Sequence, residues 1–80
     1  MKTGRPKQVL EITESERAEL QRLTRRAKTA QSLALRARIV LACGEGLANQ
    51  EVARRLHITG ATVGKWRRRF CGRRVDGLFD

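Results

Sequence analysis

The sequence feature that most constrains the fold is a segment, residues 49–69, in which a short turn joins two helical patterns. The apolar residues of the two patterns recur at helical spacing: Val52, Ala53 and Leu56, then Val63, Trp66 and Phe70. Two helices joined so tightly cross closely, and Ala53 supplies the small side chain needed where they meet. Ile58 in the turn can close the wedge between them. The segment therefore predicts a helix-turn-helix.

The residues that flank these two helices predict how each one begins. Thr59 precedes the second helix, where its hydroxyl can accept a hydrogen bond from a free backbone N–H or bind a phosphate. Ala48 precedes the first helix, where Ser or Thr would cap better, so we expect Asn49 to take that role. His57 occupies a turn position where glycine is common, because the backbone there often needs a positive φ. We interpret His57 as a strained turn residue; the alternative is a ligand or catalyst.

The residues before this segment predict two further helices. Thr13 followed by Glu16 is the pattern of a capping box, and it predicts a helix over 14–28. The narrow apolar stripe of that helix is Leu20, Leu23 and Ala27.

The next helix is expected over 30–43, with Thr29 as its N-cap and glycines at 44 and 46 to end it. Its sequence is apolar nearly all round, as in a helix contacted from several sides. No strand-like alternation is present, so we predict an all-α fold: a small bundle of about four helices.

Basic residues outnumber acidic ones, and they gather at the second helix of the motif. The chain of 80 residues has 18 Lys and Arg against 8 Asp and Glu, a formal net charge of +10. From Lys65 to Arg74 six side chains are basic and none is acidic. Such a helix fits a polyanion, and double-stranded DNA is the partner we expect. A merely solvated basic face is the alternative.

Helical geometry assigns roles to the residues of this second helix. With Val63, Trp66 and Phe70 facing inward, Trp66 serves packing and not base stacking, and the outward face would meet the major groove. The candidate recognition residues are Thr59, Gly60, Ala61, Thr62, Gly64, Lys65 and Arg68. Lys65 and Arg68 can reach guanine or bind phosphate, and both alternatives stay open. The candidate phosphate contacts are Arg67, Arg69, Arg73 and Arg74.

Other classes of function lack support in the residues. Cys43, Cys71 and the single histidine, His57, do not form a zinc-binding pattern, and a domain this small has little room for a deep pocket, so we expect no metal and no cofactor. No apolar run is long enough to span a membrane. We therefore expect a cytoplasmic protein, nucleoid-associated when bound, with reduced thiols and Cys43 in the core.

The two ends of the chain are expected to differ from the helical domain at 13–72. Residues 1–12 should form a flexible basic arm, in which Gly4-Arg5-Pro6-Lys7 could place Arg5 and Lys7 in the minor groove; a loose basic tail is the alternative. Residues 73–80 are expected to begin a linker, because Gly72, Asp76 and Gly77 break the helical pattern.

The order of the motifs resembles the N-terminal part of bacterial IS630-type transposases, relatives of the Tc1/mariner group. The resemblance rests on segments 3–7, 34–41, 63–70 and 76–80 together with the helix-turn-helix. It implies a homeodomain-like domain that binds the terminal inverted repeats of a transposon. It also implies a later RNase H-like domain with three metal-binding carboxylates, which these 80 residues lack, so we expect a fragment without catalytic activity.

Two other functions remain compatible with the sequence. A lone domain of this kind could act as a transcriptional repressor. Helix-turn-helix folds also serve as protein-interaction modules, although the uniformly basic last helix argues against this. A homodimer is one assembly compatible with either role.

Overall fold

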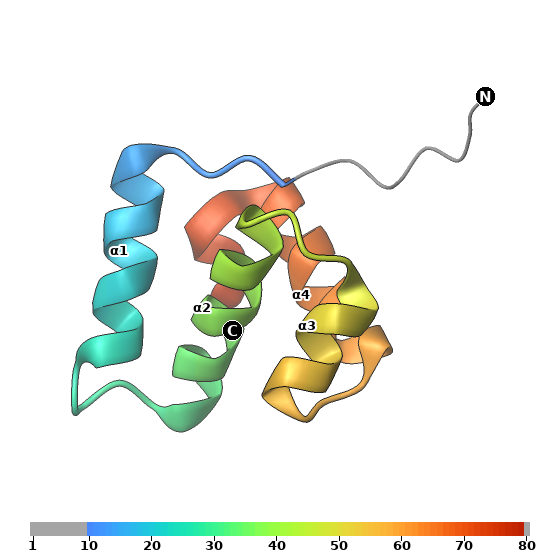
Figure 1. Ribbon diagram of the computed structural model, residues 1–80. Coiled ribbons are helices and arrows are strands. Elements are labelled where there is room, and N and C mark those ends of the chain that lie inside the picture. Colours follow the sequence, from blue (N-terminus) through green and yellow to red (C-terminus); the bar gives the residue numbers. More distant parts are fainter. Residues whose placement is uncertain (1–9, 80) are drawn as a thin grey trace.

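The computed structural model describes residues 10–79 and shows an all-α domain, as expected (Figure 1). Its elements, in chain order, are α1 (Glu14–Arg25), α2 (Gln31–Gly44), α3 (Asn49–Leu56), α4 (Gly60–Arg73) and the 3-10 helix η1 (Arg74–Leu78). The arm residues Arg5 and Lys7 lie outside the described part of the chain, so their predicted minor-groove contact stays a prediction.

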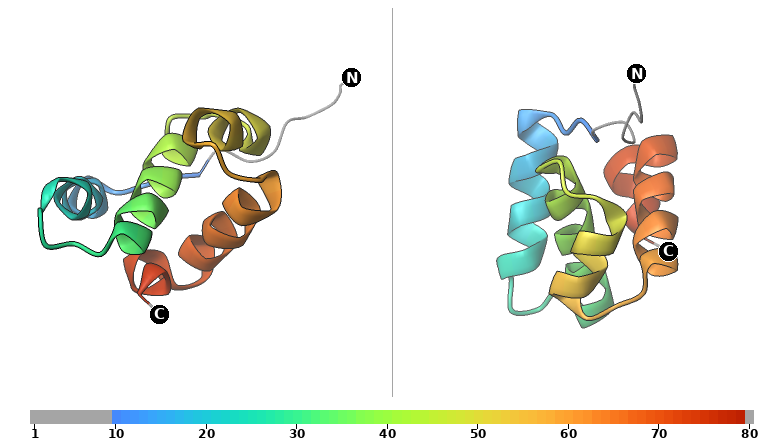
Figure 2. Two further views of the ribbon diagram at one scale, coloured as in Figure 1. Left: turned by 90° about the horizontal axis from the view of Figure 1, so that it is seen from below. Right: turned by 45° about the vertical axis from the view of Figure 1, so that its right-hand side comes forward.

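Helix α2 is the centre of the domain, because α1, α3, α4 and η1 all pack on it (Figure 2). Its residues Ala37, Ile39, Val40 and Cys43 are fully buried, which explains why its sequence is apolar on nearly every side. The expectation that Cys43 is a core residue is confirmed. Burial raises the pKa of its thiol, so the thiol stays protonated at neutral pH.

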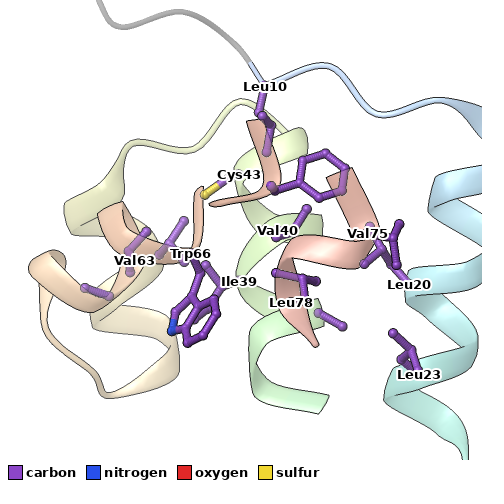
Figure 3. Close-up of a cluster of buried hydrophobic side chains, with 14 residues drawn as sticks. Leu10, Leu20, Leu23, Ile39, Val40, Cys43, Val63, Trp66, Val75 and Leu78 are labelled. Atoms are coloured by element: carbon purple, nitrogen blue, oxygen red, sulfur yellow. The ribbon is translucent and has the colours of Figure 1, made fainter. Parts of the chain in front are cut away.

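The core contains one or more residues from every element. Leu20 of α1, Val52 of α3, Phe70 of α4 and Leu78 of η1 are fully buried around α2. Figure 3 labels Leu20 and Leu78 beside Val40 of α2. Each such side chain contributes about 1.5 to 3 kcal/mol through removal of its apolar surface from water. The elements therefore depend on a shared core.

The capping box that begins α1 is confirmed. The backbone N–H of Glu16 donates to Oγ1 of Thr13 over 3.1 Å, and the backbone N–H of Thr13 donates to Oε1 of Glu16 over 3.0 Å. Two N–H groups that no helical carbonyl can reach are satisfied in this way.

Two expectations for α1 and α2 were wrong. Helix α1 ends at Arg25, because Arg26 takes an extended conformation with ψ of 131°, and Ala27 lies exposed in the following turn instead of joining the apolar stripe. The N-cap of α2 is Ala30, and no side chain caps it; Thr29 instead donates its backbone N–H to the carbonyl of Arg26. A cap needs the right backbone position as well as the right side chain.

The C-terminal residues differ from the expected linker. Helix α4 continues through Gly72 to Arg73, and η1 then folds back so that Val75 and Leu78 enter the core. Two arginines hold η1 in place: Nε of Arg69 donates to the carbonyl of Gly77 and Nη1 of Arg36 to that of Leu78, each over 2.9 Å. The packed domain thus extends at least to Leu78, because apolar burial outweighs the helix-breaking tendency of the glycines.

Candidate nucleic-acid interface

The turn between α3 and α4 has the geometry that its sequence predicted. His57 adopts the left-handed conformation, with φ of 61° and ψ of 45°, which confirms it as a strained turn residue. The N–H of Ile58 donates to the carbonyl of Ala53 over 3.0 Å and so satisfies one of the last free carbonyls of α3. The chain can therefore change direction sharply within three residues, 57–59.

Helix α3 begins at Asn49 and α4 begins directly after Thr59, but only the side chain of Thr59 caps its helix. Oγ1 of Thr59 accepts a hydrogen bond from the N–H of Thr62 over 3.2 Å, as expected. Asn49 does not cap α3; its Oδ1 accepts a hydrogen bond from Nη1 of Arg67 over 3.2 Å, which links the start of α3 to the middle of α4. The predicted cap at Asn49 was wrong because a tertiary contact engages its side chain.

The inward face of α4 is the predicted one. Val63 and Phe70 are fully buried and Trp66 is only 6% exposed. Two guanidinium groups lie over the indole ring of Trp66, that of Arg36 at 4.1 Å and that of Arg69 at 5.3 Å from the ring centroid. Trp66 is therefore a packing residue, and its ring is covered by two cationic side chains. Because the ring is not exposed, it cannot stack on a base.

The opposite face of α4 presents small and basic residues. Ala61, Lys65 and Arg68 are exposed, and they lie on successive turns of the helix. Nζ of Lys65 lies 4.9 Å from the centroid of the Trp66 ring, so its stem runs back along the helix surface in the free protein. This exposed face therefore combines the small side chain of Ala61 with two cationic side chains.

The remaining recognition candidates lie beside this face. Thr59 is exposed, while Gly60 and Thr62 are half-buried, and Oγ1 of Thr62 lies 3.0 Å from Oγ1 of Thr59. A Cβ added at Gly60 would meet open space, whereas one added at Gly64 would lie 3.5 Å from Nδ2 of Asn49. Gly64 thus borders α3 and does not point fully outward as expected.

The four arginines predicted to contact phosphate differ in their surroundings. Arg73 is exposed. Arg67 bonds to Asn49 and Arg69 bonds to Gly77, as described above. Arg74 is bound still more firmly within the domain: its Nη2 lies 2.8 Å from Oε1 of Glu16 and its guanidinium stacks on Phe70 at 4.4 Å. Arg69 and Arg74 therefore stabilise the fold through contacts within the domain, and their phosphate contacts stay predictions.

The ion pair with Arg74 also fixes the charge of Glu16. Hydrogen bonds from Arg74, and then from the backbone of Thr13, lower the pKa of Glu16 from 4.5 to about 2. Sequence reasoning missed this pair, as it missed the bond between Arg36 and Leu78, because nothing local relates residues so far apart in the chain.

Helix α3 presents a second exposed basic pair that sequence reasoning did not single out. Arg54 and Arg55 both bond to the carboxylate of Glu51, one turn earlier, and these bonds lower the pKa of Glu51. The spacings i, i+3 and i, i+4 are the signal that could have revealed this cluster.

The geometry defines the class of this protein as a helix-turn-helix domain. Helices α2, α3 and α4 enclose one core, the turn is left-handed at His57, and α4 leaves one face exposed. The family model described as a homeodomain-like domain matches residues 30–79, and the chain belongs to this family of DNA-binding helix-turn-helix domains. The matched region covers α2, α3, α4 and η1, and helix α1 precedes it.

The other comparisons add no relative. Neither the comparison with curated proteins nor the comparison with solved structures gave a match. Within residues 10–79, none of the helices is long and apolar enough to cross a membrane.

Proposed function

We propose that this domain binds double-stranded DNA sequence-specifically, with α4 as the recognition helix. The observation that carries the proposal is the division of α4 into two faces: Trp66 and its apolar neighbours are buried, while Ala61, Lys65 and Arg68 are exposed. A helix held on one side by the core and basic on the other fits the major groove.

Individual residues of α4 have distinct roles in this proposal. Ala61 and Gly60 let the helix backbone approach the bases, and Lys65 and Arg68 donate to guanine O6 and N7. The Thr59 cap leaves the first turn of α4 close to the phosphates on one side of the groove. Arg73 contacts phosphate beyond the base-reading region.

We further propose that the DNA target is the terminal inverted repeat of a bacterial transposon, and that the domain derives from a transposase. This part rests on the resemblance to IS630-type transposases and on the membership of the homeodomain-like family. In this proposal the 80 residues bind DNA and catalyse no reaction. They do so in the bacterial cytoplasm, where the transposon DNA is located.

The proposal is tested with a fluorescently labelled inverted repeat and a scrambled duplex of the same composition. Anisotropy titrations of the whole chain are repeated over a series of salt concentrations, because phosphate contacts alone give strong but sequence-independent binding at low salt. We expect the repeat to bind roughly 10³-fold tighter than the scrambled duplex at physiological salt. Equal affinity for both duplexes at every salt concentration would contradict the proposal.

A further inference from the structure

Helix α1, the turn that follows it and helix α2 contain basic residues that the proposed function does not use. From Leu20 to Gly44 the sequence has no acidic residue, yet it has six basic ones. Five of these are exposed, and we call them the junction cations: Arg22, Arg25, Arg26, Lys28 and Arg38.

The junction cations lack the internal partners that other arginines of the domain have. Arg74 pairs with Glu16, and both Arg54 and Arg55 pair with Glu51. Within the described part of the chain, no side chain of a junction cation makes a hydrogen bond or an ion pair with another residue. Like charges gathered without counter-charges destabilise the compact state by repulsion, so a bound polyanion would relieve a cost that the free domain carries.

The shape of the surface at this junction brings two of these cations together. A hollow of about 550 Å³ lies between the end of α1 and the start of α2, with Arg26 on one side and Arg38 on another. Its remaining lining is mostly polar, with Thr24, Thr29, Gln31 and Ser32. Guanidinium, hydroxyl and amide donors around one hollow are the groups that contact DNA phosphates in protein complexes.

The position of the junction separates it from the recognition helix. Helix α1 packs on α2, on the side away from α3 and from the start of α4, as both views in Figure 2 show. A straight duplex in contact with the exposed face of α4 would therefore lie on the other side of α2 from α1.

We propose that the junction cations bind the backbone of a second segment of double-stranded DNA, so that one domain holds two duplex segments on opposite sides of α2. The second contact is made to phosphates and carries no sequence preference. This inference rests on the proposed function, because α4 must hold the first segment, but it assigns a separate surface and a separate partner segment.

The test is a bridging experiment with the full 80-residue chain. One duplex that carries the α4 target is immobilised, the protein is bound, and capture of a second, labelled duplex of unrelated sequence is measured over a salt series. We expect the unaltered protein to capture the second duplex. The double variant Arg26→Gln/Arg38→Gln should bind the immobilised target within about twofold of the original affinity. Its salt slope for capture should be shallower by about 1.8, because each phosphate that a cation neutralises adds about 0.9 to that slope.

Two matched controls separate the junction from general charge. Arg54→Gln/Arg55→Gln removes the same formal charge from α3 and should leave capture unchanged, while Arg26→Lys/Arg38→Lys keeps the charge and should largely preserve capture. Circular dichroism checks that each variant is helical, which we expect because all four side chains are exposed.

The other outcomes of the bridging experiment contradict either the second DNA contact or DNA binding itself. If the protein binds the target but captures no second duplex, the inference fails and the proposed function stands. Undiminished capture by the Arg26→Gln/Arg38→Gln variant also overturns it, because bridging would then come from a protein dimer. If phosphatidylserine vesicles bind the junction and the second duplex does not, the partner is a lipid surface and the inference fails. No binding to any duplex would contradict the proposed function as well.

Discussion

The guanidinium of Arg74 donates two hydrogen bonds to the carboxylate of Glu16, one of 2.9 Å from Nε to Oε2 and one of 2.8 Å from Nη2 to Oε1. The two residues are 58 positions apart in the sequence. Nη2 of Arg74 also donates to the carbonyl of Glu11 over 2.8 Å. Arg74, the C-cap of α4 and the first residue of η1, therefore holds the first turn of α1 and the segment before it. Helix α1 is thus coupled to the end of α4 as well as to α2.

This ion pair predicts a pH dependence of stability that can be assigned to Glu16. Its pKa is lowered from 4.5 to about 2, so the stabilisation is fully present above pH 4.5 and is lost as the pH falls toward 2. Because the side chain of Arg74 is 43% exposed, we expect Glu16→Gln to lower the free energy of unfolding by only about 1 kcal/mol at pH 6. The difference between the two proteins, measured by urea unfolding, should shrink as the pH falls below 4.5 and vanish only below pH 2.

The control for this experiment is Glu14→Gln, which removes an exposed acidic residue from the same first turn of α1. Glutamine at position 16 can still complete the capping box, so helix capping is not what changes. A difference between the original protein and Glu16→Gln that stays constant from pH 6 to pH 2 would show that the ion pair contributes no stability.

Two glycines near the end of the chain should respond oppositely to alanine. A Cβ at Gly77 would collide with the carbonyl oxygen of Arg69, so Gly77→Ala should destabilise the domain by about 1 to 3 kcal/mol through overpacking between η1 and α4. A Cβ at Gly72 meets nothing within 4 Å, and alanine is the better helix former, so Gly72→Ala should stabilise by up to about 1 kcal/mol. Thermal unfolding of both variants checks the sign; destabilisation by Gly72→Ala would show that the helix does not continue as described.

The left-handed backbone at His57 makes a third prediction. With φ of 61°, a residue with a Cβ costs about 1 to 2 kcal/mol there, and glycine recovers part of that cost. We expect His57→Gly to stabilise the domain by about 0.5 kcal/mol and the β-branched variant His57→Val to destabilise it by about 1 kcal/mol or more. Urea unfolding of the two variants should rank them on opposite sides of the original protein, and the reverse order would mean that the turn relaxes to a different conformation.

The helix-turn-helix could be predicted from the sequence because its determinants are local. The apolar face of α3, the cap at Thr59 and the strained turn at His57 each depend on residues within one or two turns of helix. The burial of Val63, Trp66 and Phe70 followed from their spacing alone. The same spacing predicted which residues of α4 are exposed, except for Gly64, which the start of α3 partly covers.

The parts that could not be predicted depend on contacts between distant segments. Leu78 is buried because Arg36 and Arg69 hold η1 against the core, and no helical period relates these residues. The expected caps at Thr29 and Asn49 had suitable side chains, but the backbone at one and a tertiary hydrogen bond at the other prevented capping. Arg74 looked like part of a basic run for the same reason, since its partner Glu16 lies in another helix.

Whether α4 is the helix that reads the DNA is decided by comparing the DNA specificity of α4 variants. Affinities of Lys65→Ala, Arg68→Ala and Arg73→Ala are measured for the preferred duplex and for a scrambled duplex at one fixed salt concentration. Lys65→Ala and Arg68→Ala should each lose about 1 to 3 kcal/mol of binding free energy on the preferred duplex and much less on the scrambled one, whereas Arg73→Ala should weaken binding to both duplexes alike. An unchanged ratio of the two affinities in Lys65→Ala and Arg68→Ala would contradict the claim that the exposed face of α4 reads the DNA.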